Sequence, residues 1–455
     1  MVKDMTKGSP MKLILGFAIP MLMGMLFQQF YNLVDTMIVG KTLGVDALAG
    51  VGATACINFM IIGFCMGVCN GFAIPVAQQF GAGKYSQLRK YVYNGYICSI
   101  IFSVVLTVAS VVGCRGILTL LRTPSNIYEH AYAYIVVIFA GIPTVFLYNM
   151  VSGVIRSLGD SKTPVYFLVV SAVINIILDF VFILVFKMGV AGAAIATAIS
   201  QLVSTLVYLN YVLRKKSAFT FSVREFAPTK QMMAEILKIG VPTLTFQLLT
   251  SLSIALINRA ANGYGDAVIA GMGAVTRVTS MGTLVVFGFL KGFQPIAGFS
   301  YGAKKFDRLQ EAIKTSILWS TIFCVIVGLL MAVFSTQIIS QFTDGNAEMI
   351  SVGQRSLIAN GFSFMLFGFY TVYSSLFLAL GKGTAGFILG ACRQGICFVP
   401  VILILPVLWG LNGILYAQPI ADVLSAVITV FMASHLHKEL SAAKAKMISR
   451  EQKNF

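Results

Sequence analysis

The sequence predicts an all-α polytopic membrane protein with twelve transmembrane helices in two six-helix lobes, related by a pseudo-two-fold axis along the membrane normal. Three observations predict it: an apolar composition, recurring apolar runs of bilayer-spanning length, and an internal repeat. Of the 455 residues, 58% are hydrophobic and 11% are charged, and the mean hydropathy is +0.87. A water-soluble domain of this length carries far more charge, so the composition excludes a soluble enzyme.

Twelve apolar runs follow one another, each long enough to cross a hydrocarbon core of about 30 Å as a helix. The first is too long for the apolar core of a removable signal peptide, so we expect it to be a span. The expected spans are Leu13–Val39, Leu48–Ala77, Tyr91–Gly113, Ala131–Gly153, Pro164–Phe186, Val190–Leu213, Ile236–Asn258, Val268–Ala297, Thr315–Phe334, Ser356–Leu380, Thr384–Val407 and Leu411–Ala433.

Lysine and arginine gather in every second connection between the expected spans. They are dense at 214–216, at 304–308 and in the C-terminal tail, whereas the alternate connections hold few, such as Lys41 and Lys187. Cytoplasmic loops carry this excess of basic residues, which predicts a multi-pass protein of the cell membrane with both termini in the cytoplasm. The net charge of +17 therefore reflects topology and does not indicate a nucleic-acid partner.

Cysteine and histidine show no spacing typical of a metal site. The eight cysteines fall mostly within the expected spans, and the three histidines lie in loops or the tail. The segment "GAGK" at 81–84 lacks the full spacing of a phosphate-binding loop. We therefore expect no enzyme, no cofactor, no disulfide framework and no ATP-binding partner.

The strongest organisational signal is an internal duplication at an offset of about 221 residues. It predicts two lobes, residues 1–218 with spans one to six and residues 219–455 with spans seven to twelve. The paired stretches are "LGFAIP" at 15–20 with "LKIGVP" at 237–242, "GVDALAGVGA" at 44–53 with "GDAVIAGMGA" at 265–274, "IPVAQQFGAGKYSQLRK" at 74–90 with "QPIAGFSYGAKKFDRLQ" at 294–310, "IRSLGDSKTP" at 155–164 with "FLALGKGTAG" at 377–386, and "GVAGAAIATAIS" at 189–200 with "GLNGILYAQPIA" at 410–421.

An even number of spans in each copy makes this a parallel repeat, in which both copies begin on the same side of the membrane. Two such bundles can enclose a cavity that opens to either side in turn, so the sequence favours a transporter. Pro20 and Pro242 occupy equivalent positions, as do Pro75 and Pro295. Each removes a backbone hydrogen bond from a span and permits a bend, although membrane helices are in general richer in proline.

Three acidic residues, Asp35, Asp179 and Asp422, fall well inside expected spans. A carboxylate at the centre of a membrane helix costs about 2.5–3.5 kcal/mol on insertion scales, so each should face protein or water. On span one, Gln28, Asn32 and Asp35 follow at i, i+4 and i+7 and form one polar stripe.

Span five sets Asn175 and Asp179 one turn apart on one face, and span six adds Thr197 beside small residues. With Asp35 they offer hard oxygen ligands, which suit a sodium ion or a shared proton. Carboxylates that repel one another at close range favour binding of either cation, which could exchange for a cationic substrate. Alternatively, Asp35 and Asp179 serve only as hydrogen-bond acceptors between packed helices.

The second lobe carries two internal arginines. Arg393 lies about as far before the turn near residues 407–411 as Asp422 lies after it, so we predict that they pair and that the pair is structural. Arg277 on span eight could instead face the cavity, which would favour an anionic or zwitterionic substrate.

Aromatic and methionine side chains are abundant, with 35 Phe, 17 Tyr and 20 Met. Most should pack in the core or face lipid, but a subset could offer planar cations a flat, adaptable surface in the cavity. The candidates are Phe59, Met60, Tyr148, Met150, Phe369, Tyr370 and Tyr373.

Several stretches form a specific combination: "QQFYNLVDTMIVGKTLGVDALA" at 28–49, "GAGKYSQLRK" at 81–90, "RSLGDSKTP" at 156–164, "NIILD" at 175–179, "GVAGAAIATAIS" at 189–200 and "YGAKKFDRLQ" at 301–310. Taken together, they make the chain resemble the multidrug and toxic compound extrusion (MATE) family over essentially its whole length.

The resemblance implies a V-shaped exporter of small, cationic and amphipathic molecules, driven by a gradient of Na⁺ or H⁺. Carried over by position, the cation site of the family's first lobe falls on Asp35, Asn175, Asp179 and Thr197. Spans seven and ten contain no carboxylate, so the chain resembles the DinF-like or MepA-like branch. The alternative is a flippase of the same superfamily that moves lipid-linked oligosaccharides, for which Arg277 and Arg393 could hold a pyrophosphate group.

Overall fold

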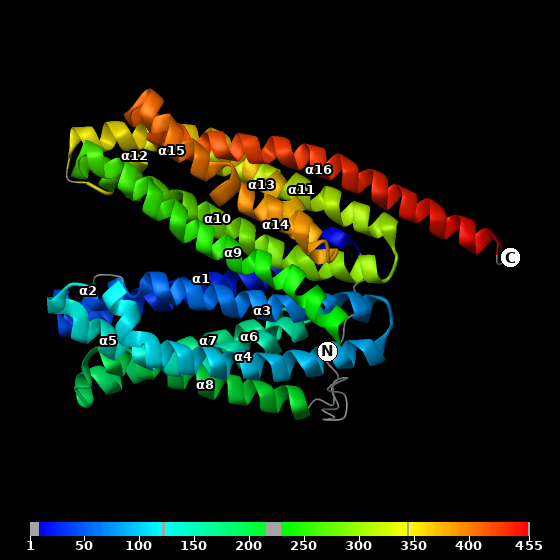
Figure 1. The fold of residues 1–455 in the computed structure, drawn as a ribbon, viewed down its shortest axis with the longest axis horizontal. Helices are drawn as coiled ribbons and strands as arrows, with labels where there is room; N and C mark the ends of the chain where they lie inside the picture. The colour runs from blue at the N-terminus through cyan, green and yellow to red at the C-terminus, as the bar shows by residue number, and fades with distance from the viewer. Residues whose placement is uncertain (1–8, 121–122, 215–228, 344, 454–455) are drawn as a thin grey trace. The chain divides into compact units, whose positions relative to one another are not determined.

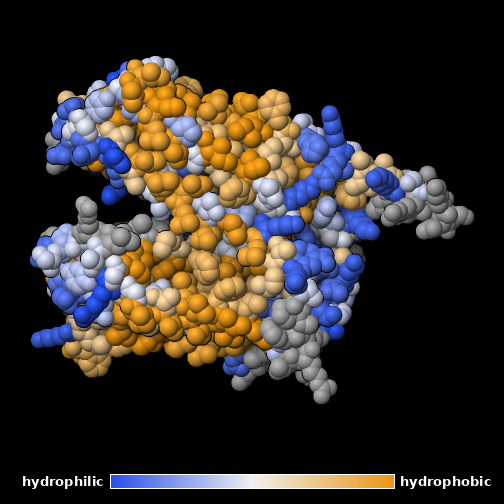
Figure 2. All heavy atoms as spheres, viewed as in Figure 1, coloured by the Kyte–Doolittle hydropathy of each residue, from blue (hydrophilic) through white to orange (hydrophobic). Residues whose placement is uncertain are grey.

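A computed structural model describes residues 9–120, 123–214, 229–343 and 345–453, and within these residues every regular element is helical. Eleven helices are long and apolar enough to cross a membrane, and a bent pair raises the total to as many as twelve spans. Figure 2 shows apolar side chains over the middle of each part of the chain and hydrophilic ones gathered at its ends. This pattern matches a multi-pass membrane protein.

The described residues of the first copy of the repeat fold into eight α-helices and one π-helical segment (Figure 1). They are α1 (Pro10–Leu43), α2 (Val45–Ala53), α3 (Ala55–Gly81), α4 (Tyr85–Leu120), α5 (Ser125–Ala140), α6 (Ile142–Ser157), α7 (Lys162–Asp179), the π-helix η1 (Phe180–Val185) and α8 (Gly189–Arg214). The helices α7 and α8 pack together, as do α3 and α6.

The second copy begins with α9, and α13 packs against α10, α11, α14 and α16. Its elements are α9 (Lys230–Ala261), the 3₁₀ turn η3 (Asn262–Tyr264), α10 (Asp266–Gly302), α11 (Phe306–Val333), α12 (Ser335–Ser340), α13 (Ala347–Ala379), α14 (Gly383–Ala391), the π-helix η4 (Cys392–Ile396), α15 (Phe398–Trp409) and α16 (Leu411–Lys453).

Two expected spans differ from the prediction. The expected span Leu48–Ala77 is divided. Helix α2 ends at Ala53, and the hydroxyl of the next residue, Thr54, donates to the carbonyl of Val51 at 2.7 Å; α3 then carries the span. The expected span Ala131–Gly153 is the bent pair α5 and α6, which meet at Gly141 with a bend of 45°. Pro143 stands in the first turn of α6, where its missing N–H costs nothing and favours a new helix start.

The duplication extends to the turns between helices. Gly44 and Gly265 precede α2 and α10 with φ of 88° and 98°, in the left-handed region that glycine favours. In another turn Gly83 (φ 69°) is matched by Lys304 (φ 55°), so the second copy keeps the conformation without the glycine.

By proximity of backbone atoms the chain divides into two units. Unit 1 contains Ile19–Gly240, and unit 2 contains Thr6–Ala18 and Val241–Phe455. The beginning of α1, residues 10–18, therefore packs in unit 2, and the beginning of α9, residues 230–240, packs in unit 1. The points at which α1 and α9 pass from one unit to the other lie beside the equivalent prolines Pro20 and Pro242. The predicted lobe division at residues 218 and 219 follows the sequence repeat and stays a prediction.

The beginnings of α1 and α9, each of which packs in the other unit from the rest of its helix, lie against equivalent glycines. We call them the exchanged helix beginnings. A Cβ atom on Gly71 of α3 would lie 2.8 Å from the carbonyl oxygen of Ile236, and one on Gly292 of α10 would lie 2.7 Å from the backbone nitrogen of Ala18. Tyr91 of α4 also donates a hydrogen bond to the carboxylate of Glu235 in α9. Each beginning is thus held by close backbone packing in its unit.

Candidate functional site

Helix α1 carries the predicted polar stripe in unit 1. Its end packs with α2, α5, η1 and α8 around a small apolar cluster that includes Ile38 and Val39. Within the helix, Asp35 is half-buried, whereas Gln28 and Asn32 are exposed. Of the three predicted stripe residues, only Asp35 is turned toward the interior of the unit.

Helix α7 supplies the second carboxylate. Asn175 and Asp179 are 1% and 0% exposed, one turn apart on the buried face. Asp179 is the last residue of α7, and the π-helix η1 follows at once. Such wide turns are rare and recur at functional sites.

The four predicted site residues come together from α1, α7 and α8. The carboxyl groups of Asp35 and Asp179 face one another within hydrogen-bonding reach. The amide of Asn175 donates to Thr197 Oγ1 at 3.2 Å, and Thr197 Oγ1 donates to the carbonyl oxygen of Ala193 at 3.1 Å. Asn175 is thereby oriented, because its nitrogen is engaged by Thr197.

Four oxygens of this cluster are sealed from solvent without a donor: Asp35 Oδ1, both carboxylate oxygens of Asp179, and Asn175 Oδ1. Buried acceptors are almost always hydrogen-bonded, because an unmet one costs free energy, and a charged one costs more. No described arginine or lysine pairs with either carboxylate. A cation coordinated by oxygen, or a proton between the two carboxyl groups, would satisfy these atoms.

A tightly held transition metal fits this cluster less well than a hard cation. Within the described residues, no three histidine, cysteine, aspartate or glutamate side chains are grouped as metal ligands. Two carboxylates, an amide oxygen and a hydroxyl are oxygen donors, which hard cations prefer. Such a set of oxygen donors is chemically suited to hold a hard cation or a proton.

Three polar residues near the carboxylates were missing from the prediction. The Tyr31 hydroxyl lies within hydrogen-bonding reach of Gln28 and Gln201, and Tyr134 of α5 lies near both carboxyl groups. Tyr31 stands one turn before Asp35, and Gln201 one turn after Thr197, so helical spacing could have found both. Nothing in the sequence separates Tyr134 from the many other aromatic residues.

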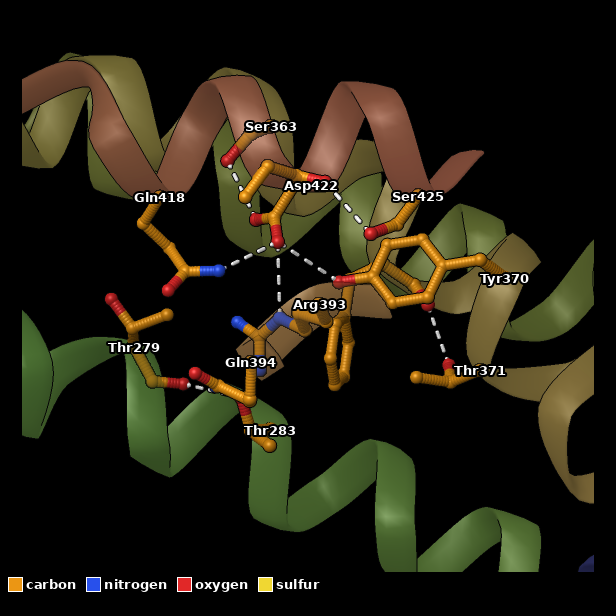
Figure 3. A network of polar contacts seen from close by, with 12 residues as sticks. Thr279, Thr283, Ser363, Tyr370, Thr371, Arg393, Gln394, Gln418, Asp422 and Ser425 are labelled. Carbon is orange, nitrogen blue, oxygen red and sulfur yellow. Dashed lines mark hydrogen bonds and ion pairs between the residues drawn. The ribbon is translucent and has the colours of Figure 1, made fainter. Parts of the chain in front are cut away.

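Unit 2 contains the third buried carboxylate, in a different setting (Figure 3). Asp422 on α16 forms the predicted contact with Arg393 of η4, with Arg393 Nε 3.1 Å from Asp422 Oδ1. Tyr370 and Gln418 donate to the same oxygen at 3.2 and 2.9 Å, and Ser363 donates to Oδ2 at 3.0 Å. Both oxygens of Asp422 are therefore satisfied.

Most of the predicted cavity aromatics pack inside their own unit. Met150 is fully buried, and the Tyr148 hydroxyl donates to the carbonyl of Pro164 at 3.0 Å. Tyr370 binds Asp422, and the hydroxyl of Tyr373 lies 2.9 Å from His437 Nε2. Met150, Tyr370 and Tyr373 are thus buried and Tyr148 is partly buried, and their expected place in a substrate cavity stays a prediction.

The remaining candidates divide by exposure. Met60 is 49% exposed, and Arg277 is exposed without an ion pair among the described residues. Phe369 is half-buried and packs edge-on against Tyr373, with ring centroids 5.3 Å apart. The side chain of Phe59 lies outside the described residues.

Comparison with known proteins gives a consistent result. The MatE family model matches residues 20–181 and 242–404, once in each copy of the repeat. The chain is 33% identical over 372 residues to the probable multidrug resistance protein YoeA of Bacillus subtilis, covering 80% of each chain. It is 28% identical over 454 residues to the multidrug export protein MepA of Staphylococcus saprophyticus, covering 97% of each.

Solved structures agree with these sequence relatives. A MATE transporter crystallised in a bent conformation matches with a TM-score of 0.90 and 25% identity, over 97% of this chain and 98% of that one. An outward-facing multidrug resistance MATE transporter matches with a TM-score of 0.88 at the same identity and coverage.

Proposed function

This chain belongs to the MATE family of multidrug efflux transporters and to its MepA-like branch, and from that premise we propose a coupling mechanism. It expels cationic, amphipathic small molecules from the cytoplasm by alternating access, in exchange for Na⁺ or H⁺ that binds between Asp35 and Asp179. Asn175 and Thr197 complete the cation site. The relatives are named for drug export, which does not favour the alternative of a lipid-linked oligosaccharide flippase.

One observation carries the proposal: four sealed oxygens lie together in the cluster of Asp35, Asp179 and Asn175 and have no hydrogen-bond donor. Two apposed carboxylates repel one another, and burial strengthens the repulsion because little water screens it. A cation that enters the pair removes this repulsion. The cluster therefore has a strong reason to bind one positive charge and to change geometry when that charge leaves.

The helices that carry Asp35 and Asp179 suggest how cation binding could be coupled to a conformational change. Asp35 is on α1, whose beginning packs in unit 2, whereas Asp179 is on α7 in unit 1. A cation that draws Asp35 toward Asp179 would move α1, which enters both units. Pro20 lies inside α1 near the point where it passes from one unit to the other and permits a bend there. In this mechanism cation binding shifts the population between the inward-open and outward-open states.

Membrane orientation follows from the same proposal. Basic side chains gather in the turns at 84–90 and 304–308 and along the end of α16, which supports a cytoplasmic location for these segments and for both termini. Labelling of single cysteines introduced at exposed Lys84 and Lys187, using a membrane-impermeant thiol reagent on intact cells, tests this. Reaction at position 187 and protection at position 84 are expected, and the reverse pattern would overturn the orientation.

Efflux from liposomes tests the coupling site. Protein is reconstituted with a cationic dye inside, and dye release is followed under an imposed sodium gradient or an imposed proton gradient. We expect one gradient to drive release by the wild type, and Asp35→Asn and Asp179→Asn each to remove the gradient-driven part. The gradient that acts identifies the coupling ion.

Asp46→Asn is the matched control, because Asp46 is an exposed carboxylate of unit 1 in α2. It should leave efflux unchanged. Gradient-driven efflux that survives in Asp179→Asn would contradict the coupling site, and no dye movement by folded wild type under either gradient would contradict the proposed transport of cationic substrates.

A further inference from the structure

The carboxylate of Asp422 in unit 2 has more donors than one arginine supplies. Arg393, Tyr370 and Gln418 all reach Oδ1, and Ser363 reaches Oδ2. Asp422 is only 2% exposed, so this negative charge is covered on all sides. Three neutral donors therefore share with Arg393 the stabilisation of this carboxylate.

Arg393 uses only one end of its guanidinium for this contact. Its Nε meets Asp422, and the Tyr370 hydroxyl lies within hydrogen-bonding reach of the guanidinium. Neither Nη atom is a sealed donor without a partner, and neither meets a carboxylate among the described residues. Arginine carries five N–H donors in a planar fork, and the terminal pair is suited to binding a second carboxylate. The 9% of the side chain that stays exposed is therefore chemically important.

The fork is held rigidly. The guanidinium stacks on the ring of Phe367 with its carbon 4.6 Å from the ring centroid. The π-helix η4 that carries it is tied to α9, because Ser253 Oγ donates to the backbone carbonyl of Gln394 at 2.7 Å. In Figure 3, Arg393 and Gln394 lie between Asp422 and Thr279 and Thr283 of α10. A ligand group bound beside Arg393 would therefore meet two terminal nitrogens held in a fixed position.

We propose that the terminal nitrogens of Arg393 bind the carboxylate of zwitterionic substrates, which makes unit 2 an anion-recognising subsite of the transporter. The inference rests on the proposed export function and names a substrate class within it: amphipathic molecules that carry both a cationic centre and a carboxylate. A cationic group is not expected here, because Asp422 is only 2% exposed and both of its oxygens already have donors.

A purely structural role for the Arg393–Asp422 pair would not require the terminal nitrogens of Arg393 to lack a carboxylate partner. A buried ion pair with no further role gains most when each N–H group of the arginine finds a strong acceptor, and unmet donors of a charged group are costly. Within the described residues the two Nη atoms find no carboxylate. A ligand carboxylate would supply one through charge-assisted, paired hydrogen bonds.

Two dyes that differ by one ester provide the test. Rhodamine 6G is a cation with an ethyl ester, and rhodamine 19 is the same dye with a free carboxylate. Binding of each dye to the purified full-length protein is measured by fluorescence anisotropy, separately from efflux. The comparison is made between wild type and the double variant R393Q/D422N, which removes both charges together and leaves neither buried alone.

We expect the double variant to bind rhodamine 19 roughly tenfold more weakly than wild type, with the affinity for rhodamine 6G unchanged within about twofold. The second variant, Arg393→Lys, keeps the charge and loses the planar fork, so it should weaken rhodamine 19 binding by a smaller factor. Unaltered elution as a monodisperse species and retained rhodamine 6G binding show that each variant is folded.

Equal loss of both dyes would mean that Arg393 serves the packing of unit 2 only, and no loss of either would mean that the carboxylate binds elsewhere. Either result overturns the subsite, as does a failure of wild type to bind rhodamine 19. If rhodamine 6G is exported and rhodamine 19 shows no dependence on Arg393, the proposed export stands and this inference fails. If neither dye is exported although both bind as expected, the export proposal fails and the subsite stands.

Discussion

The two units treat a buried carboxylate in opposite ways. In unit 1, Asp35 and Asp179 face one another and leave oxygens without donors, whereas in unit 2 every oxygen of Asp422 has a donor and an arginine is in contact. Both settings face the same desolvation cost. One copy of the duplicated fold thus holds a resident counter-charge beside its buried carboxylate, whereas the described residues supply none for Asp35 and Asp179 in the other copy.

Replacing each buried aspartate by asparagine is the most direct test of whether the two units hold their carboxylates differently. Asp422→Asn leaves Arg393 buried without its counter-charge, and loss of one partner of such a pair costs about 3–5 kcal/mol of the free energy of unfolding. Asp179→Asn, at an equally buried position, removes an unpaired charge and should cost less than about 1 kcal/mol. Thermal unfolding in detergent measures both, and equal losses would show that the two carboxylates are held alike.

The exchanged helix beginnings should respond alike in the two units. In Gly71→Ala and Gly292→Ala the new Cβ would lie within 3 Å of backbone atoms of α9 and α1, respectively. Overpacking of this kind costs about 1–3 kcal/mol. Gly273→Ala in α10 is the control, since nothing lies within 4 Å of the place its new methyl group would occupy and the change should be neutral or stabilising. A loss confined to one of the two variants would argue against equivalent contacts.

Cation binding should stabilise unit 1 alone. At ten times its dissociation constant the coupling ion adds about 1.4 kcal/mol to the free energy of unfolding. We expect this gain with sodium chloride relative to choline chloride if Na⁺ is the ion, or on acidification if H⁺ is. Asp35→Asn should abolish the gain and Asp46→Asn should keep it. A gain that persists in Asp35→Asn would place the cation elsewhere.

The smallest effect concerns a turn that the copies build differently. Lys304 adopts φ 55° where the first copy has Gly83. A left-handed conformation costs a non-glycine residue about 1 kcal/mol, so Lys304→Gly should stabilise the protein by up to that amount. Lys305→Gly, next to it at φ −86°, should instead be neutral or destabilising. Stabilisation by both changes would point to the loss of charge and not to the backbone.

Helical spacing predicted much of the candidate site because its residues obey it. Asn175 and Asp179 lie one turn apart, and the predicted contact of Arg393 with Asp422 followed from equal distances to one turn. The same rule failed for Gln28 and Asn32, since a polar stripe does not reveal which of its members faces protein. Helical spacing also cannot separate a cavity-lining role from core packing for Met150, Tyr370 and Tyr373, because the period of a helix is identical for a face toward the core and a face toward an opening.

The hydropathy of the sequence could not predict where helices are locally interrupted. The bend at Gly141 and the end of α2 at Ala53 interrupt apolar runs that are continuous in composition, because capping and hydrogen bonding decide where a helix stops. The π-helical segments η1 and η4 have no known residue preference strong enough to be seen in one sequence. Their positions, directly after Asp179 and around Arg393, became visible only with the backbone.

The exchange of α1 and α9 beginnings bears on how the chain is assembled during synthesis. Unit 1 is incomplete until residues 230–240 have left the ribosome, although the rest of it is made earlier, and unit 2 incorporates residues 10–18 that were made before any other part of it. Neither half of the duplicated chain is therefore a finished folding module. A gene split between the copies would yield two fragments that each lack a helix end, and they would need to be inserted together to mature.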